Sequence, residues 1–562
     1  MLTRAENWAE IQANPEISVL IIGAGINGIG TFRDLALQGV DVLMVDKGDF
    51  CSGASAASSH MLHGGIRYLE NGEFRLVREA LVERNLLLKN APHYAKPLPT
   101  SIPIFSVLSG FLNAPLKFVR LREKPTERGA AVIKIGLMFY DLFARRHRVM
   151  PKHKLIRRKQ ALKDYPGLRS DVKYVAKYYD AWMPYPERLC IELVQDGENS
   201  FPDARALNYV AVVGAGGDSV QLRDELTGKS AIVKPKIVIN AAGPWIDFAM
   251  RAIGKETRFI GGTKGSHLIL DNPDLYKACN GGEFFFENDD GRIVLIMPYV
   301  DGKVMVGTTD IRIDDPEQAV CTEEETDYML NLVNRILPGI KVDKSQIIFK
   351  FSGVRPLPNS DKGYTGNVSR DHQIEVTEPD SIIKFPVFSL IGGKWTTFRA
   401  FSEQAADTAL KRLGIPRKVK TAERKIGGGK DYPREPDAYI SEVAEDFKIK
   451  RNRVETLFER YGTRALYLTN YIVDTGDDAP LKNNPKYSRR ELQYLLNTEH
   501  IARLDDLVLR RTLMAWLGNF TLPLLQEVAE IAADALGWDD ARKSVEIQRT
   551  RDILANKHGL KL

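Results

Sequence analysis

Cysteine is scarce in this sequence, and long apolar runs are lacking. The 562 residues include four cysteines, and no two of them form a C-x-x-C pair. Four cysteines are too few for disulfide bonds to stabilise a chain of this size, so a reducing, cytoplasmic compartment is expected. Residues 1–15 have no apolar segment of the kind found in signal peptides. No window reaches the roughly 18 apolar residues of a membrane-spanning helix. We therefore predict that the chain does not cross a membrane.

A strong charge of one sign is lacking as well. Lysine plus arginine number 79 and aspartate plus glutamate 73, which leaves a net charge of +6. So mild an excess does not predict nucleic-acid binding. The nine histidines show no metal-ligand spacing such as H-E-x-x-H, so no metal is expected. With 44% hydrophobic and 27% charged residues, the composition is that of a folded protein. Its length allows about three or four domains.

A glycine-rich turn lies between two apolar segments near the start of the chain. Residues 17–22 and 40–46 have the composition of buried strands. Between them, G-A-G-I-N-G at 23–28 opens a helical stretch, and Asp46 follows 18 residues after the last glycine. This order of strand, turn, helix, strand and acid predicts a dinucleotide-binding βαβ unit. The alternative is a structural turn that binds no ligand.

Each residue type in this turn has a physical role toward a dinucleotide. Gly23 permits a tight turn, Gly25 lets the backbone approach a pyrophosphate, and Gly28 lets the helix pack on the strand. The helix N-terminus attracts phosphate, and Asp46 can accept hydrogen bonds from ribose hydroxyls. The candidate cofactor-binding residues of this unit are Gly23, Gly25, Ile26, Asn27, Gly28, Asp46 and Lys47.

The following segment, 50–68, favours a flavin over a nicotinamide. It reads F-C-S-G-A-S-A-A-S-S-H-M-L-H-G-G-I-R-Y, and its small residues would let the backbone pass close to a flat ligand. Its candidate flavin-binding residues are Ser55, Ser58, Ser59 and Gly64. A solvated surface loop is the alternative, which the apolar Leu62, Ile66 and Leu69 disfavour.

Two later turns repeat the pattern of a strand running into glycine. The first spans 236–247 and contains Gly243; the second spans 389–397 and contains Gly393, Lys394 and Thr396. The helix after the second turn could stabilise negative charge on a reduced flavin. Strand-like segments at 265–271, 292–298 and 304–308 predict an antiparallel lid sheet. Residues 436–555 are helical in pattern, with Ser488 and Glu491 spaced as a capping box.

An apolar segment at 130–143 stands next to a basic cluster. Eight basic residues and no acid lie between Leu142 and Lys163. An apolar helix beside such a cluster suits peripheral contact with an anionic membrane, and the region 102–159 is the candidate. A core helix followed by a solvated basic face explains the pattern equally well.

Several motifs together resemble the FAD-dependent glycerol-3-phosphate dehydrogenase family. They are V-L-I-I-G-A-G-I-N-G, A-S-S-H-M-L-H-G-G-I-R-Y-L-E, I-N-A-A-G-P-W, K-G-S-H, V-G-T-T-D, F-S-G-V-R-P-L and G-G-K-W-T-T-F-R, in this order. The resemblance implies an α/β FAD-binding Rossmann-like domain of the glutathione-reductase type, an antiparallel-sheet substrate domain and an all-helical C-terminal domain. We expect the FAD-binding domain at 17–100, 195–262 and 340–415, the substrate domain at 101–194 and 263–339, and the helical domain at 425–562.

The resemblance also implies a reaction. The family oxidises sn-glycerol 3-phosphate to dihydroxyacetone phosphate: hydride leaves C2 for the flavin, a base takes the hydroxyl proton, and the electrons pass to a quinone or to oxygen. Expected partners are therefore FAD, a small phosphate substrate, a quinone and the inner face of the cytoplasmic membrane; a homodimer is left open. The alternatives are a peroxide-forming oxidase, a dehydrogenase of another polyol phosphate, a flavoprotein without turnover, and a nicotinamide-dependent enzyme.

Arginine suits the substrate phosphate because its guanidinium is a planar fork of donors. Arg355 in S-G-V-R-P-L is the first candidate, followed by Arg67, Tyr68 and Arg370; a surface ion pair is the alternative for each arginine. Histidine suits the base, and the candidates are His63 and His267. Their roles can be exchanged, or one of them only braces the flavin. Lys264 and Lys394 are candidate electrostatic helpers.

Three positions depart from the family pattern. Asp46 stands where glutamate is frequent, and His60 where lysine is common. The segment 182–187, W-M-P-Y-P-E, replaces a run of the D-D-A-R type. If this segment lines the substrate end, the substrate changes, and a tetritol phosphate is the rival to glycerol phosphate.

Overall fold

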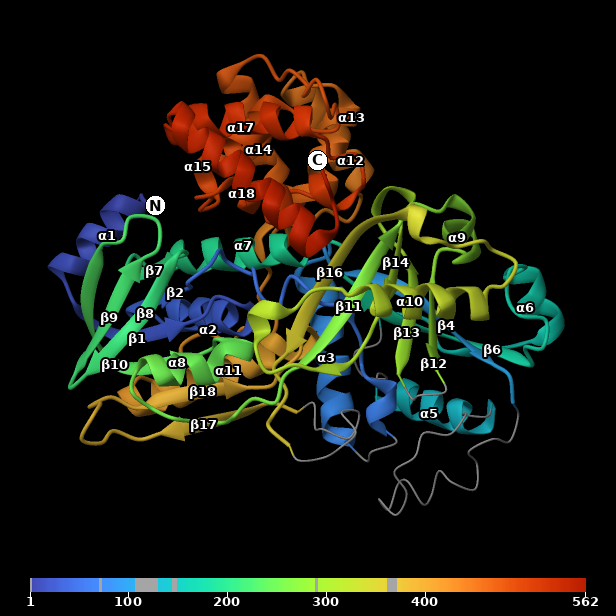
Figure 1. The fold of residues 1–562 in the computed structure, drawn as a ribbon, viewed down its shortest axis with the longest axis horizontal. Helices are drawn as coiled ribbons and strands as arrows, with labels where there is room; N and C mark the ends of the chain where they lie inside the picture. Colours follow the sequence, from blue (N-terminus) through green and yellow to red (C-terminus); the bar gives the residue numbers. More distant parts are fainter. Residues whose placement is uncertain (1–2, 70–72, 107–129, 144–148, 289–291, 361–370) are drawn as a thin grey trace.

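Two β-sheets lie side by side beneath a body of C-terminal helices (Figure 1). The computed structural model describes residues 3–69, 73–106, 130–143, 149–288, 292–360 and 371–562. Within these ranges no helix is both long and apolar enough to cross a membrane. No group of three or more potential metal ligands was found in the same part of the chain.

The first sheet has a parallel centre in the order β18-β10-β1-β2-β7. An antiparallel strand, β17, edges β18, and the hairpin β8–β9 joins the first half of β10. The bounds are β1 Glu16–Ile22, β2 Val42–Val45, β7 Ala204–Leu207, β8 Val210–Gly216, β9 Ser219–Asp224, β10 Ser230–Asn240, β17 Gln373–Thr377 and β18 Val387–Ile391. The central strands read as continuous apolar runs because both of their faces are covered.

Two separate cores cover the two faces of this sheet. Val19 and Ile21 pack with α2 (Ile26–Leu37), α7 (Pro186–Glu198) and α11 (Phe398–Leu413). Leu20 and Ile22 point the other way, toward α1 (Arg4–Ala13), α8 (Ile246–Ala252) and the hairpin. This alternation follows from the two-residue period of a strand.

The second sheet has the order β15-β11-β14-β13-β12-β4-β6-β3, with β16 on β11 and β5 on β6. Its bounds are β3 Met61–Leu62, β4 Lys96–Ile104, β5 Lys154–Arg157, β6 Tyr174–Trp182, β11 Thr263–Leu270, β12 Glu283–Glu287, β13 Ile293–Pro298, β14 Val304–Gly307, β15 Ile311–Arg312 and β16 Ile347–Arg355. One face packs on α6 (Arg158–Asp164), α9 (Pro273–Ala278) and α10 (Glu323–Ile336). At the β4–β6 end, the other face packs on α3 (Phe74–Asn90) and α5 (Ala130–Phe143).

The C-terminal helices share a core with the second sheet. The helices are α12 Pro436–Asp446, α13 Arg451–Tyr461, α14 Ala465–Thr475, α15 Arg489–Thr498, α16 Leu504–Asp506, α17 Leu522–Leu536 and α18 Asp540–His558, with a π-helical turn η11 at Leu507–Arg511. Trp516 stacks on Phe349 of β16 with ring centroids 4.6 Å apart, and His558 stacks on Phe349 at 4.4 Å. The predicted helical domain is confirmed, and aromatic packing joins it to β16.

Two elements lie elsewhere than the expected domain ranges suggest. β16 falls within 340–415, the range expected in the FAD-binding domain, but it pairs along its length with β11 of the second sheet. Residues 186–194 of α7 fall within 101–194, the range expected in the substrate domain, but α7 packs on α2. Long-range pairing decides both placements, and no local pattern reports it.

A buried carboxylate ties the C-terminal helices to the first sheet. Asp49 accepts hydrogen bonds from Arg511 Nη1 and Nη2 at 2.7 and 2.9 Å and from Arg510 Nε at 2.6 Å. Asp49 and Arg511 are fully buried. Burial alone raises the pKa of Asp49, but the charges of Arg511 and Arg510 outweigh it, so the pKa ends well below its ordinary value.

We predict that Asp49→Asn lowers the free energy of unfolding by about 3 kcal/mol, because it leaves Arg511 buried without a counter-ion. Urea denaturation followed by circular dichroism measures the change. The matched control is Asp437→Asn, which removes the exposed partner of Arg451 and should leave the urea midpoint unchanged. Equal midpoints for Asp49→Asn and the wild type would show that the pair does not hold the domains together.

Candidate active site

A cavity of about 1500 Å³ lies where the three parts of the chain meet. The first sheet contributes the turns after β1, β10 and β18, and the second sheet contributes β11, β12, β13 and β16. Leu509, Arg510 and Trp516 of the C-terminal body complete the wall. In parallel α/β sheets, ligands bind beyond the carboxyl ends of the strands, which is where this cavity begins.

The glycine turn after β1 has the shape that the sequence predicts. Gly23 has φ +101°, and a Cβ there would lie 2.7 Å from Ala242 Cα. A Cβ at Gly28 would overlap the Gly23 carbonyl oxygen. A Cβ at Gly25, by contrast, would meet only Ser55 Oγ, at 3.3 Å. Gly23 and Gly28 therefore let the backbone close up, while Gly25 leaves space on the cavity side.

The start of α2 faces this space. Gly25 supplies no side-chain cap, and the Ile26 amide donates instead to Ser55 Oγ at 3.0 Å. Free amides and the partial positive charge at a helix N-terminus attract a phosphate. Ser55 thus lies beside the position where a pyrophosphate would bind.

Asp46 holds the glycine turn in place. Its carboxylate accepts hydrogen bonds from the Ala24 amide at 2.7 Å and the Gly48 amide at 2.8 Å. Burial raises the pKa of Asp46 to about 6 in spite of these two bonds. Lys47 also lines the cavity, with Nζ 2.6 Å from Glu317 Oε1 and 5.1 Å from the Trp245 ring. Asp46 remains the candidate for a ribose contact.

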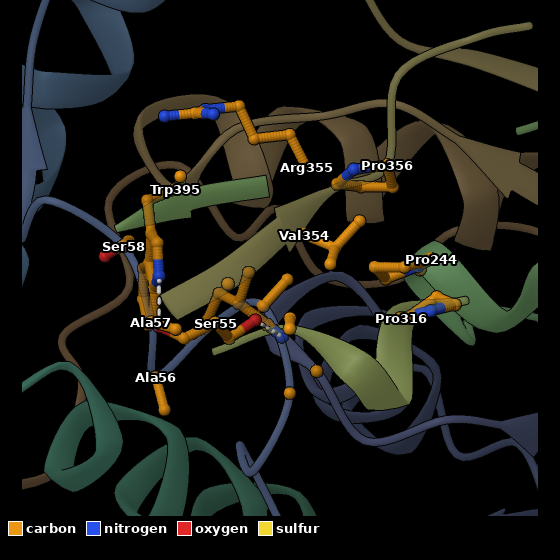
Figure 2. A pocket seen from close by; sticks show the side chains of 18 of the residues that line it. Ser55, Ala56, Ala57, Ser58, Pro244, Pro316, Val354, Arg355, Pro356 and Trp395 are labelled. Atoms are coloured by element: carbon orange, nitrogen blue, oxygen red, sulfur yellow. Dashed lines mark hydrogen bonds between the residues drawn. The ribbon is translucent and has the colours of Figure 1, made fainter. Parts of the chain in front are cut away.

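The turn after β18 meets the first turn and the serine-rich segment. Gly392 and Gly393 have φ +76° and +90°, and a Cβ at Gly393 would lie 2.7 Å from Asn27 Nδ2. Figure 2 shows Trp395 beside Ser55, with its indole N–H donating to the Ser55 carbonyl oxygen at 2.8 Å. Thr396 Oγ1 accepts from the His63 amide at 3.2 Å. Three segments that are distant in sequence therefore surround one space.

Lys394 carries a buried positive charge on this wall. Its Nζ lies 4.1 Å from the centre of the Tyr68 ring, a cation–π contact. Among the described residues, this Nζ has no hydrogen-bond partner. A buried ammonium without an acceptor is unfavourable. The site is therefore suited to an anionic or electron-rich ligand group beside Lys394.

His267 lies on β11 at the floor of the cavity. Its ring stacks on Phe351 of β16, with centroids 4.8 Å apart and planes 9° from parallel. Nε2 is 2.9 Å from Ser59 Oγ, whereas Nδ1 has no partner in the part of the chain that the structure describes. Burial, and then the positive charge of Arg355, lower the pKa of His267 well below its ordinary value. The imidazole is therefore neutral at neutral pH.

Arg355 reaches the same floor from the end of β16 (Figure 2). Nη1 lies 3.2 Å from Asp310 Oδ1, and Nη2 donates to Thr308 Oγ1 and the Thr309 carbonyl, both at 3.1 Å. The guanidinium crosses Gly265, where a Cβ would come within 2.7 Å of Arg355 Cζ. Gly265 thus supplies the space, and Asp310 orients the fork.

Most of the remaining candidates also lie on the cavity wall. The cavity is lined by Gly23, Gly25, Ile26, Asn27, Asp46, Lys47, Ser55, Ser58, Ser59, His63, Tyr68, Gly243, His267, Arg355, Gly393, Lys394 and Thr396. Gly28 packs behind the first turn. Gly64 also lies off the wall, and its amide donates to Asp180 Oδ1 at 3.1 Å. The Arg67 side chain and Arg370 lie outside the described residues.

Lys264 does not face the cavity. Its Nζ pairs with Glu325 Oε2 at 2.7 Å and the Val320 carbonyl at 2.8 Å, toward α10. On a strand, Lys264 and Ser266 point to one face, and Gly265 and His267 to the other. This alternation is visible in K-G-S-H. It could have shown from the sequence that Lys264 and His267 point to opposite faces, so that only one of them reaches the cavity. The same motifs contained Gly265 and Asp310, which sequence reasoning missed as the residues that place Arg355.

Comparisons with known proteins agree with this geometry. The family model "FAD dependent oxidoreductase" matches residues 18–376, and "C-terminal domain of alpha-glycerophosphate oxidase" matches residues 419–543. The glycerol-3-phosphate dehydrogenase of Synechocystis sp. is 32% identical, with 98% of each chain covered. The chain belongs to the FAD-dependent glycerol-3-phosphate dehydrogenase family. The resemblance inferred from the motifs, the cofactor FAD and the predicted fold class are confirmed.

One further sequence relative and one solved structure are also similar to this chain. A D-erythritol 1-phosphate dehydrogenase of Brucella abortus is 33% identical over 70% of this chain and 73% of its own. The structure of a glycerol-3-phosphate dehydrogenase from Bacillus halodurans complexed with FAD has a TM-score of 0.74. It is 23% identical, and the match covers 98% of this chain and 97% of that chain. At this identity the structural likeness supports the shared fold.

The glycine turn gives a direct test of the FAD site. We predict that Gly25→Ala leaves the fold intact but lowers FAD affinity at least about tenfold, because the added methyl group lies where the backbone would approach the pyrophosphate. The flavin absorbance per mole of purified protein measures the loss. Gly216→Ala is the control, since a Cβ there meets nothing within 4 Å. Full flavin content in Gly25→Ala would place the pyrophosphate elsewhere.

Proposed function

We propose that the protein oxidises sn-glycerol 3-phosphate to dihydroxyacetone phosphate and that the electrons pass from FAD to a membrane quinone. The observation that carries this proposal is the common face of β11 and β16. There the Arg355 guanidinium lies over Gly265, two residues before His267. Alternate residues of a strand point to one face about 6.6 Å apart. A phosphate at Arg355 therefore leaves C2, three bonds from phosphorus, near the imidazole.

The residues around the cavity fit FAD. The open Cβ direction at Gly25 and the start of α2 suit the pyrophosphate, and Asp46 suits the ribose. The hydroxyls of Ser55, Ser58, Ser59 and Thr396 suit the flavin end. So does the Lys394 ammonium, which has no hydrogen-bond partner among the described residues. When bound, FAD supplies the acceptor for the hydride that leaves C2.

Side chains of this protein bind the phosphate, take the hydroxyl proton and hydrogen-bond the substrate. Arg355, held by Asp310, binds the phosphate as a two-pronged donor. His267 stays unprotonated in its buried position and takes the C2 hydroxyl proton. If its Nε2–H donates to Ser59, the Nδ1 lone pair is left for that proton. His63, fixed by its amide at Thr396, is assigned to a hydrogen bond with the substrate.

A second candidate substrate is a tetritol phosphate. The support is the Brucella abortus relative named D-erythritol 1-phosphate dehydrogenase, which is 33% identical over much of the chain. The departures at 182–187 also stand near the cavity, since Glu187 lines it. The reaction class would be the same, and the polyol chain would be one carbon longer.

We also propose a peripheral contact between α5 and an anionic membrane. Its exposed residues include Ile135, Met138, Phe139 and Leu142, and in Figure 1 it lies at the edge opposite the C-terminal helices. An amphipathic helix beside basic residues suits such a surface. We predict that Met138→Asp lowers flotation with phosphatidylglycerol vesicles, while Val545→Asp, an exposed site on α18, does not. Equal flotation of both variants would contradict the contact.

The function is tested by anaerobic mixing of the flavin-containing enzyme with sn-glycerol 3-phosphate. We expect the flavin band to bleach in the wild type. In His267→Gln we expect bleaching to slow by about 10²- to 10³-fold, with the substrate concentration at half-saturation little changed, because proton transfer is lost and binding is kept. His153→Gln, whose partner is Asp141, is the control. A wild type that glycerol phosphate and tetritol phosphate both leave oxidised would contradict the proposal.

Two variants of Arg355 separate its two roles. Arg355→Lys keeps the charge and loses the fork, so we expect KM to rise at least about tenfold with the pH profile unchanged. Arg355→Gln also removes the charge that lowers the pKa of His267. The pKa of His267 then rises, so the limiting rate of flavin reduction falls off at a higher pH as the solution is acidified. The control is Arg312→Lys on β15. Identical acid limbs in the two Arg355 variants would contradict this coupling.

A further inference from the structure

A buried carboxylate lies behind the second sheet, on the face that packs against α10. It belongs to Glu325, in the first turn of α10, which is 3% exposed. Its Oε1 accepts hydrogen bonds from Ser266 Oγ at 2.8 Å and Thr309 Oγ1 at 2.6 Å. Its Oε2 accepts from Lys264 Nζ at 2.7 Å and from the Thr322 amide at 3.0 Å. Four donors therefore fix this carboxylate in one place.

Thr309 joins the carboxylate to the proposed phosphate anchor. Its hydroxyl donates to Glu325 and accepts from the Ser266 amide at 3.0 Å. Its carbonyl oxygen, on the other side, accepts from Arg355 Nη2 at 3.1 Å. The next residue, Asp310, lies 3.2 Å from Arg355 Nη1. One residue thus bonds the carboxylate through its side chain and the guanidinium through its backbone.

The carboxylate of Glu325 is charged. Burial raises its pKa, but the hydrogen bonds from Lys264 and then from Thr309 outweigh burial, so the pKa ends below its ordinary value. Hydrogen bonds to a charged acceptor are shorter and stronger than those between neutral groups. The position of Thr309 is therefore determined by α10 and β11 together, and not by its own turn alone.

We propose that Glu325 and Thr309 are positioning residues for Arg355, and that they determine how tightly the site binds the phosphate group. The inference rests on the proposed function, in which Arg355 binds the substrate phosphate. A guanidinium binds phosphate at two points only when its plane is correctly oriented. If the Thr309 turn is released, the carbonyl that receives Arg355 Nη2 moves, and the fork tilts. The loss then falls on substrate binding rather than on hydride transfer.

The first test removes one hydroxyl. Thr309→Val keeps the shape of the side chain and loses its bonds to Glu325 and Ser266. We expect KM for sn-glycerol 3-phosphate to rise about five- to tenfold, with the limiting rate of anaerobic flavin reduction within about twofold of the wild type. Thr309→Ser keeps the hydroxyl and should restore KM.

The control for this test is Thr550→Val on α18. It removes a buried hydroxyl that donates to the Glu546 carbonyl at 2.8 Å, and KM should not change. An unchanged KM in Thr309→Val, or an equal rise in Thr550→Val, would overturn the positioning role.

A double-mutant cycle shows whether Thr309 acts through the guanidinium. Thr309→Val is added to Arg355→Lys, which has already lost the fork. We expect the second change to raise KM by less than about twofold on this background, because two residues that share one interaction are not additive. A KM equal to the product of the two single effects would show that Thr309 acts independently of Arg355.

Two double variants keep the proposal testable if Thr309→Val folds poorly. Lys264→Met is combined with Glu325→Gln in one and with Glu325→Leu in the other, so neither leaves a buried charge unpaired. Glutamine still offers an oxygen to Thr309, and leucine does not. We expect KM to be about fivefold higher in the leucine form than in the glutamine form. Equal KM values would overturn the role of Glu325.

Binding without turnover separates this inference from the proposed function. n-Propyl phosphate carries the phosphate and no secondary alcohol to oxidise. Its dissociation constant for the oxidised holoenzyme, measured by calorimetry, should rise about fivefold in Thr309→Val. Equal affinities in a protein that glycerol phosphate reduces would overturn the positioning role alone. A weaker affinity in Thr309→Val, with a wild type that neither polyol phosphate reduces, would overturn the proposed function alone.

Discussion

A carboxylate removed from water holds the C-terminal helices against the FAD-binding sheet, and the cavity depends on that contact. Asn208 Nδ2 donates to Asp49 at 2.9 Å, but among the described residues its positive partners are Arg510 and Arg511 of η11. A buried ion pair adds little net stability over an apolar contact, but a broken one is strongly unfavourable, so it selects one arrangement. Docking of η11 then places Trp516 against Phe349 and Phe351 of β16. Phe351 in turn supports the His267 ring. The orientation of the proposed base therefore depends on a domain to which we assign no part in the reaction.

Some charged groups around the cavity are paired behind its wall, and others have no hydrogen-bond partner among the described residues. Arg355 is oriented by Asp310, and Asp180 is neutralised by Arg84. Lys394 has no acceptor in the described part of the chain, and Glu283 avoids a charge by holding its proton. In a low-dielectric interior an unpaired polar group is unfavourable, so both groups are less stable in the empty cavity than they would be beside a hydrogen-bonding partner.

Local patterns predicted the parts of this molecule that local physics determines. The turn at 23–28 was recognisable because only glycine permits the conformation at Gly23 and the close packing at Gly28. Pairing between distant strands has no such local pattern. β16 was therefore expected in the FAD-binding domain, although it pairs with β11 of the second sheet. Ser488 and Glu491 show the limit within a single helix. Ser488 caps α15 as expected, but the buried Glu491 side chain pairs with Arg453 and Arg460. Burial, which the sequence does not report, decided between two uses of one spacing.

The arrangement of strands separates Glu283 from the proposed reaction centre. Arg355 and His267 lie on the adjacent strands β16 and β11, so a single local register determines their separation. Glu283 lies on β12, and two strands, β14 and β13, stand between it and His267. A change of side chain at Glu283 therefore acts at a distance from the imidazole and the guanidinium. Because the FAD end is built on the other sheet, it is insulated from such a change as well.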